Sequence, residues 1–210
     1  MKLLLEWLLS SPSAATDARE DWWARYLTAA RPFAPSIERA AAGGFVADRL
    51  AYAFAAGYHN ALRALLAGAP DVPDVPDVPD VPDAPDDLAA ALCITEDGGA
   101  HPRAIATRLE SLPDNGWRLL GTKRWATLAD RARVLFVAAS VGQTPDGRNQ
   151  LRLVRVPVDA PGLTITLMPE TAFTPEIRHA SVRLDGVPVS AADIFPGDGY
   201  QNYIKPFRTI

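Results

Sequence analysis

A proline recurs at every third position between Ala69 and Asp87, where the triplet Val-Pro-Asp is repeated four times. Each proline removes a backbone hydrogen-bond donor and fixes φ, so this segment can join neither a helix nor the interior of a sheet. Regular prolines favour extended polyproline II structure instead. The sequence therefore predicts a linker over residues 69–87, with a separate folding unit on each side. A role as the ligand of a proline-binding domain is the alternative.

Residues 1–68 predict a small helical domain. Met1–Leu9 is apolar, but Glu6 interrupts a run that is already too short for a membrane span or a secretion signal, so an amphipathic first helix is favoured. Thr16 can cap a second helix that runs toward Arg31-Pro32. Its first turn has the carboxylates of Asp17, Glu20 and Asp21, and its buried side is expected to consist of Trp22, Trp23, Tyr26 and Leu27.

A longer helix is expected after the breaks at Pro32 and Pro35. Ser36 can cap a short turn, and apolar residues then recur at spacings of three and four until Gly68 and Pro70. The apolar positions are Val46, Leu50, Phe54, Tyr58, Leu62 and Leu65. The residues expected on its solvent side are Asp48, Arg49, Asn60 and Arg63.

Residues 88–196 have the pattern of an antiparallel β domain. Short runs rich in valine, leucine and threonine alternate with turn signals such as Asn-Gly, Pro-Gly and Asp-Gly. Seven strands in this space predict a barrel or a sandwich, and an α+β class for the whole chain. The expected strands are Ala90–Thr95, Ala104–Glu110, Trp117–Thr122, Val134–Ser140, Leu151–Pro157, Thr164–Met168 and His179–Leu184.

Composition excludes several classes of function. The net charge is −4 with scattered basic residues, which disfavours a nucleic-acid partner. Cys93 is the single cysteine, so no disulfide forms within the chain and a cytoplasmic location is expected. His59 and His179 have no partners at metal-ligand spacing, so we expect both to be structural and no metal to bind. Neither a Gly-x-Ser-x-Gly elbow nor a Gly-x-Gly-x-x-Gly fingerprint occurs, which disfavours a hydrolase and a nicotinamide-binding unit.

Two segments next to expected strands could carry chemistry. In Asp97-Gly98-Gly99 the glycines allow backbone amides to approach a ligand, although an ordinary hairpin turn is the simpler interpretation. Trp125 and Thr127 lie two residues apart, so in an extended strand both point to the same side. An indole beside a hydroxyl suits a flat heteroaromatic ligand. On spacing alone, the alternative is that Trp125 fills the core and Thr127 is β-branched filler.

The order of four motifs resembles the middle domain of acyl-CoA dehydrogenases. They are Cys-Ile-Thr-Glu from Cys93, Gly-Trp-x-Leu-x-Gly-Thr-Lys-x-Trp-x-Thr from Gly116, Pro-Gly-Leu from Pro161, and Val-Arg-Leu-Asp-Gly-Val-Pro-Val from Val182. The resemblance covers residues 90–199. Residues 16–68 are similar in placement to the N-terminal helices of that family, and residues 197–210 resemble the start of its C-terminal helical domain. The resemblance implies a flavoprotein that uses FAD to dehydrogenate an acyl-CoA thioester between its α and β carbons.

The resemblance also implies roles for individual residues. Ile94 and Thr95 would hold the pyrimidine edge of the flavin, Trp125 would pack on the isoalloxazine, and Thr127 would form a hydrogen bond near N5. The family usually continues Thr-Glu with Pro-Gly-x-Gly-Ser-Asp, whereas residues 97–102 here are Asp-Gly-Gly-Ala-His-Pro. His101 takes the place of the usual serine, so Ala100 and His101 are the expected substrate-binding positions, although such a histidine can equally be solvated only.

The catalytic carboxylate of the family lies in the C-terminal helical domain, and the resemblance places it beyond Ile210. No residue of this chain is therefore expected to be the base, the chain alone is expected to have little or no turnover, and apolar surface is expected where further helices would pack. Implied partners are acyl-CoA, an electron-transfer flavoprotein or another electron acceptor, and further copies of the full-length chain. The alternative is a non-catalytic β-domain module that binds another protein or an acyl ligand.

Overall fold

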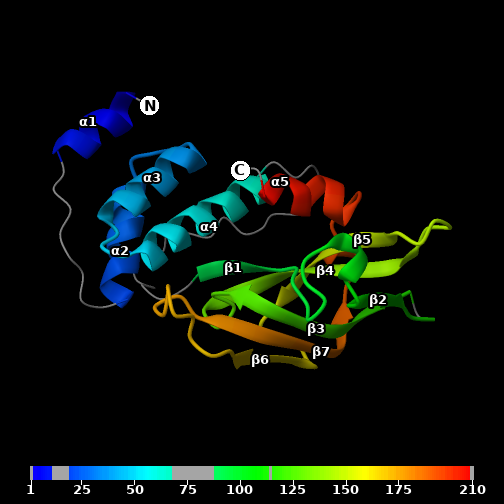
Figure 1. The fold of residues 1–210 in the computed structure, drawn as a ribbon. Coiled ribbons are helices and arrows are strands. Elements are labelled where there is room, and N and C mark those ends of the chain that lie inside the picture. Colours follow the sequence, from blue (N-terminus) through cyan, green and yellow to red (C-terminus); the bar gives the residue numbers. More distant parts are fainter. Residues whose placement is uncertain (1, 11–18, 68–87, 114, 209–210) are drawn as a thin grey trace.

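A layer of helices lies across one side of a curled β-sheet (Figure 1). The computed structural model describes residues 2–10, 19–67, 88–113 and 115–208. The helices are α1 (Lys2–Ser10), α2 (Arg19–Ala30), α3 (Ser36–Val46), α4 (Leu50–Ala67) and α5 (Lys205–Phe207). The strands are β1 (Leu88–Cys93), β2 (Arg108–Ser111), β3 (Trp117–Thr127), β4 (Ala132–Gln143), β5 (Asn149–Pro157), β6 (Leu163–Leu167) and β7 (His179–Val189). These elements confirm the predicted α+β class.

Several sequence predictions lie outside the described residues. They are the linker over 69–87, the Thr16 cap with Asp17, the side chains of Glu20 and Asp21, and the helix stop at Gly68 and Pro70. The amphipathic helix expected at the start of the chain is present as α1, and Leu4 and Trp7 of this helix pack at the edge of the helical core.

Helices α3 and α4 are separate, which differs from the prediction of a short turn followed by one long helix. Ala47 caps α3 in an extended conformation, with φ of −77° and ψ of 128°. Leu62 and Leu65 are buried as expected, but in the first half of α4 Leu50 is 71% exposed and Phe54 is 48% exposed. The residues buried there are instead Ala51, Tyr52, Ala55, Ala56 and His59.

Aromatic stacking between α2 and α4 explains which face of α4 is buried. The ring of Trp22 stacks on Tyr26 at 5.6 Å and on Tyr52 at 4.7 Å between centroids. Asn60, expected at the solvent side, is 1% exposed, because its amide Nδ2 donates to Tyr26 Oη at 2.7 Å and to the Ala56 carbonyl at 2.8 Å. The prediction for Asn60 is therefore wrong, since its amide Nδ2 finds two acceptors within the helical core.

The seven strands form one mixed sheet in the order β1-β4-β2-β3-β7-β6, with β5 paired along most of β4 off this path. Most neighbours are antiparallel, as predicted, but β1 and β2 both run parallel to β4. Parallel pairs need crossover connections, and the chain crosses from β1 and from β2 through other elements before it forms β4. The sheet curls into a half-barrel around a core formed by residues such as Leu119, Leu135 and Val182.

The bounds of several strands differ from the prediction, and two of these differences bear on the site. A short 3-10 helix at Pro102–Ala104 occupies the start of the expected strand 104–110, so β2 begins only at Arg108. Strand β3 continues beyond the expected Thr122 to Thr127, which places Trp125 and Thr127 inside a strand rather than after it.

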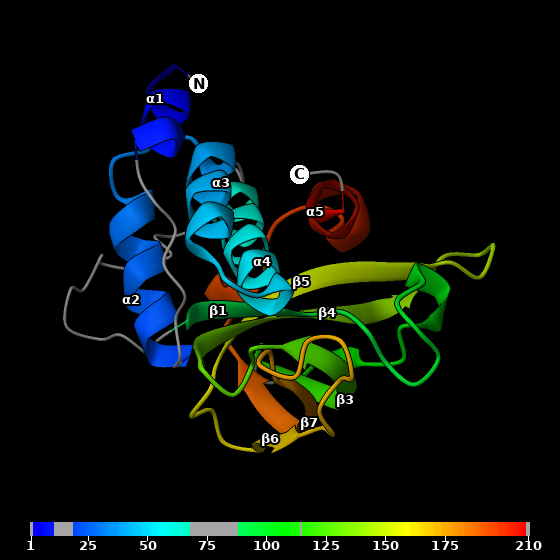
Figure 2. The same cartoon turned by 60° about the vertical axis from the view of Figure 1, so that its left-hand side comes forward.

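The helical layer and the sheet share a core. Leu62 and Leu65 of α4 pack with Leu92 of β1 and Phe136 of β4. The backbone N–H of Leu92 donates to the Tyr58 hydroxyl at 2.7 Å. Figure 2 shows α3 and α4 side by side above the sheet, with α5 next to them. The helical region therefore packs directly on the β domain.

Helical turns follow the β domain, in the segment predicted to begin a C-terminal helical domain. Tyr200–Ile204 form a π-helical turn that continues into α5. Tyr203 and Ile204 are buried against the sheet, and the Tyr203 hydroxyl donates to the Pro196 carbonyl at 2.8 Å. Phe207 contacts Tyr58 edge to face, so this segment also joins α4.

Candidate functional site

The end of β3 presents Trp125 at the surface. A bulge between Lys123 and Ala126 interrupts the pairing of β3 with β7, and within it Trp125 has φ of 57°. A bulky residue adopts this left-handed conformation only where its surroundings hold it. The backbone N–H of Trp125 points to Met168 Sδ at 3.3 Å, and its side chain is 48% exposed. Trp125 therefore does not fill the core, and a large aromatic surface remains available.

Thr127 and the indole of Trp125 both contact His179. The two strands pair Thr127 directly with His179, and Thr127 Oγ1 lies 3.3 Å from His179 Nδ1. The His179 ring also contacts Trp125, with centroids 5.7 Å apart and an interplanar angle of 69°. Thr127 itself is 8% exposed. Sequence spacing predicted the indole and the hydroxyl as a pair, but it assigned His179 only a structural role.

Ile94 and Thr95 lie against the same part of β3. The Thr95 carbonyl accepts a hydrogen bond from the Arg124 backbone N–H at 2.7 Å. The Ile94 carbonyl lies 3.3 Å from Lys123 Nζ. Both residues are half-buried and directly follow β1. The structure thus brings the four predicted cofactor-binding residues, Ile94, Thr95, Trp125 and Thr127, to one stretch of the sheet.

A buried ion pair connects the segment that follows β1 with strand β3. Lys123 Nζ lies 2.7 Å from Glu96 Oε1, and the two side chains are 0% and 7% exposed. Glu96 also accepts hydrogen bonds from the Thr107 hydroxyl and backbone N–H and from the Ala106 N–H, at 2.7, 3.0 and 2.7 Å. Burial raises the pKa of the Glu96 carboxyl, but the Lys123 ammonium and these hydrogen bonds outweigh it, so the pKa is lowered. Glu96 is therefore an ionised structural anchor.

Ala100 and His101 follow a tight turn in which Glu96 and Gly99 exchange backbone hydrogen bonds of 3.1 and 2.9 Å. The exposed His101 begins the 3-10 helix, because its Nδ1 accepts from the Arg103 N–H at 3.2 Å. The Ala100 carbonyl accepts from Arg208 Nη2 at 2.9 Å. These contacts fix the loop, and the substrate-binding role of both residues remains a prediction.

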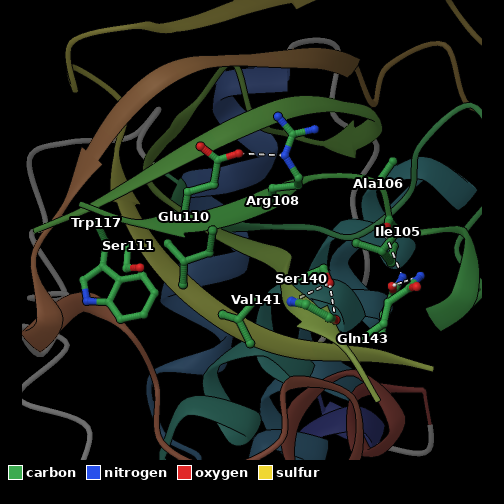
Figure 3. A pocket seen from close by; sticks show the side chains of 12 residues that line it. Ile105, Ala106, Arg108, Glu110, Ser111, Trp117, Ser140, Val141 and Gln143 are labelled. Carbon is green, nitrogen blue, oxygen red and sulfur yellow. Dashed lines mark hydrogen bonds and ion pairs between the residues drawn. The ribbon is translucent and has the colours of Figure 1, made fainter. Parts of the chain in front are cut away.

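A separate pocket of about 670 Å³ opens where β2 and the end of β4 diverge (Figure 3). Its wall combines the indole of Trp117 and the side chain of Val141 with Arg108 and Glu110, whose Nε and Oε1 atoms lie 2.8 Å apart. None of Ile94, Thr95, Trp125 or Thr127 lines this pocket. The predicted site is thus the surface around Trp125 and not this hollow.

Other classes of site receive little support from the described residues. Across these parts of the chain, no three histidine, cysteine or acidic side chains are placed to bind one metal ion. No described helix has both the length and the apolar character needed to cross a membrane. Burial raises the pKa of the Cys93 thiol to about 12, so this cysteine is not a reactive thiolate. The cytoplasmic location stays a prediction.

Comparison with known proteins identifies the β region. Residues 91–187 match the family model described as the acyl-CoA dehydrogenase middle domain. The β region is an acyl-CoA dehydrogenase middle domain. A probable acyl-CoA dehydrogenase of Bacillus subtilis is 31% identical to this chain over 112 residues, which are 52% of this chain and 28% of that protein.

Solved structures extend the likeness of fold from the middle domain to the helices. Butyryl-CoA dehydrogenase of Megasphaera elsdenii has a TM-score of 0.70 at 14% identity, over 90% of this chain and 52% of that one. A glutaryl-CoA dehydrogenase of Mycobacterium smegmatis, solved in complex with FADH2, has a TM-score of 0.60 at 19% identity, over 98% and 56%. The chain thus has the acyl-CoA dehydrogenase fold and spans about half the length of these relatives.

Sequence reasoning missed two features of this middle domain, His179 and the Glu96–Lys123 ion pair. Glu96 and Lys123 are 27 residues apart, and Thr127 and His179 are 52 apart. Both pairings depend on strand register, which local sequence does not specify at such separations. A signal was available for Lys123, because a lysine within an alternating strand pattern needs a buried partner if its side faces the core.

Proposed function

We propose that this chain is the flavin-binding part of an acyl-CoA dehydrogenase-like flavoprotein, which uses FAD to dehydrogenate an acyl-CoA thioester between its α and β carbons. The proposal rests mainly on the indole of Trp125, which is 48% exposed and held in a left-handed bulge. Exposing a rigid aromatic side chain forgoes the free energy of its burial, so a ligand that covers it gains that free energy. A planar ring system is the ligand shape that fits.

The residues around Trp125 have polar groups that can face the pyrimidine edge and N5 of a flavin. In the described part of the chain, no hydrogen bond uses the Thr95 hydroxyl, and the hydroxyl of Thr127 is bonded only to His179. Thr95 and the backbone at Ile94 would hold the pyrimidine edge, Trp125 would pack on the ring, and Thr127 would meet N5. Bound FAD would supply the acceptor for the hydride that leaves the acyl β carbon.

The protein's own contribution is to place these groups and keep them rigid. The Glu96–Lys123 ion pair and the bond from the Arg124 N–H to the Thr95 carbonyl hold the Thr95 segment at β3. Such preorganisation lowers the entropy that binding costs. Glu96 is not proposed as the base that removes the α-proton, because donors occupy both of its oxygens.

The proposed α-proton acceptor is the carboxylate of a C-terminal helical domain, as the family resemblance implies. Leu50 and Phe54 support packing by further helices, because these large apolar side chains lie one turn apart on α4 and are exposed. The proposal includes acyl-CoA near Ala100 and His101, an electron-transfer flavoprotein or another electron acceptor, and a homo-oligomeric assembly. The 210-residue chain is expected to bind FAD.

Flavin binding is tested with the purified 210-residue chain and added FAD, by a stoichiometric yellow complex and by quenching of flavin fluorescence. Trp125→Ala is expected to raise the Kd for FAD about tenfold or more, because it removes the stacking surface. Thr127→Ala is expected to raise the Kd for reduced FAD about three- to tenfold, the effect of one hydrogen bond.

The matched control is Phe54→Ala, which removes an aromatic ring of the same 48% exposure from the helical layer. It is expected to leave the Kd for FAD unchanged. Equal flavin retention in wild type, Trp125→Ala and Thr127→Ala would contradict the assigned site. A compact monomer that binds no FAD would instead favour the non-catalytic binding module.

A further inference from the structure

His179 contacts the hydroxyl oxygen of Thr127, which is the only polar atom of that side chain. Thr127 Oγ1 lies 3.3 Å from His179 Nδ1, within reach of a hydrogen bond in which either atom is the donor. The contact is built into the sheet, because Thr127 and His179 are direct partners in the register of β3 and β7. The edge contact with Trp125 further restricts rotation of the imidazole ring.

The direction of this hydrogen bond decides what Thr127 presents outward. A hydroxyl has one proton and two lone pairs. If Nδ1 is unprotonated, Thr127 donates its proton to His179 and only lone pairs face a ligand. If Nδ1 carries the proton, Thr127 accepts from His179 and can donate outward.

Chemistry favours the first arrangement. Burial lowers the pKa of His179, so the ring is neutral at neutral pH and one of its nitrogens is an acceptor. An imidazole nitrogen is a more basic acceptor than an alcohol oxygen, and the hydrogen bond is stronger when the better acceptor receives the proton. The Thr127 hydroxyl therefore donates to His179 Nδ1.

We propose that His179 is a positioning residue that fixes Thr127 as a hydrogen-bond acceptor, so that the site binds reduced FAD, whose N5 carries a proton, in preference to oxidised FAD. This inference rests on the proposed flavin site. Oxidised flavin has an unprotonated N5, which needs a donor, and a Thr127 whose proton is already used cannot supply one. The resulting difference in affinity raises the reduction potential of the bound flavin.

The direction of the hydrogen bond is tested without FAD by 15N NMR of the imidazole in the 210-residue chain. Protonated and unprotonated ring nitrogens have widely separated 15N shifts, and the His179 signals are assigned by their loss in His179→Phe. An unprotonated Nδ1 is expected. A protonated Nδ1 would overturn the proposal, whether or not the chain binds FAD.

The consequence for flavin is tested by a double-mutant cycle. The quantity measured is the Kd for oxidised FAD divided by the Kd for reduced FAD. His179→Phe keeps an aromatic edge beside Trp125 but frees the Thr127 hydroxyl, and is expected to lower this ratio about three- to tenfold. In a Thr127→Val background the same change is expected to leave the ratio unaltered. An equal effect of His179→Phe in both backgrounds would overturn the role through Thr127.

Thermal unfolding of each variant identifies any loss of folding, and the ratio is compared only among folded forms. Absence of FAD binding by the wild-type chain would refute the proposed function, while the NMR result would still decide the direction of the Thr127–His179 hydrogen bond. The two failures are therefore distinguishable.

Discussion

Lys123→Met is expected to lower the free energy of unfolding by about 3–5 kcal/mol. The substitution keeps the length of the side chain but leaves Glu96, which is 7% exposed, without its positive partner. A buried carboxylate that loses its counter-charge must remain ionised at a high desolvation cost or take up a proton. Urea denaturation at neutral pH, followed by circular dichroism, measures the loss.

Arg183→Met on the neighbouring strand β7 is the matched control. Arg183 Nη2 lies 2.8 Å from Asp185 Oδ2, close to the 2.7 Å of the Lys123–Glu96 pair, but its side chain is 67% exposed. Water screens such a pair, so its loss is expected to change the free energy of unfolding by less than about 1 kcal/mol. Similar losses in Lys123→Met and Arg183→Met would refute the structural role assigned to the buried pair.

The Glu96–Lys123 pair also explains why the residues proposed to bind flavin converge. It lies under the junction between the end of β1 and the bulge of β3, with Lys123 Nζ 3.3 Å from the Ile94 carbonyl. Thr107, directly before β2, donates to the same carboxylate. Three segments far apart in sequence therefore meet at one buried charge, and the exposed groups of Thr95 and Trp125 are positioned from the interior.

The sequence predicted the strands well because their alternation is a local property. Trp125 and Thr127 were also found from local spacing, but that reasoning assumed a regular strand. The bulge makes the difference, because it exposes Trp125 at φ of 57° while Thr127 stays buried. Such an irregularity depends on the partner strand β7, and nothing within residues 117–127 specifies it.

The errors in the helical region have a similar origin. Leu50 and Phe54 fit the helical period, yet both are exposed, because aromatic packing with Trp22 selects the face of Tyr52. Asn60 is polar, yet it is buried because Tyr26 supplies a hydrogen-bond partner. Periodicity identifies a helix, whereas the face that is buried depends on the neighbouring helix.

Acid is expected to destabilise the helical layer through His59. Burial lowers the pKa of this histidine from 6.5 to about 3, and the nearby Arg63 and Arg39 act in the same direction. Above pH 6.5 the ring is neutral in both the folded and the unfolded chain, so it costs no stability there. Below pH 6.5 the unfolded chain takes up a proton that the folded chain does not, and stability falls until the pH reaches the folded pKa.

The expected loss attributable to His59 is about 2 kcal/mol at pH 5, relative to pH 7.5, since each pH unit below the unfolded pKa is worth about 1.4 kcal/mol. His59→Leu removes the titrating group and is expected to abolish this part of the pH dependence. Urea denaturation of both proteins at the two pH values measures the difference, and carboxylates common to both cancel in the comparison. Parallel losses in wild type and His59→Leu would mean that the ring of His59, which contacts Trp23 edge to face at 5.2 Å, accepts a proton without unfolding the helical core.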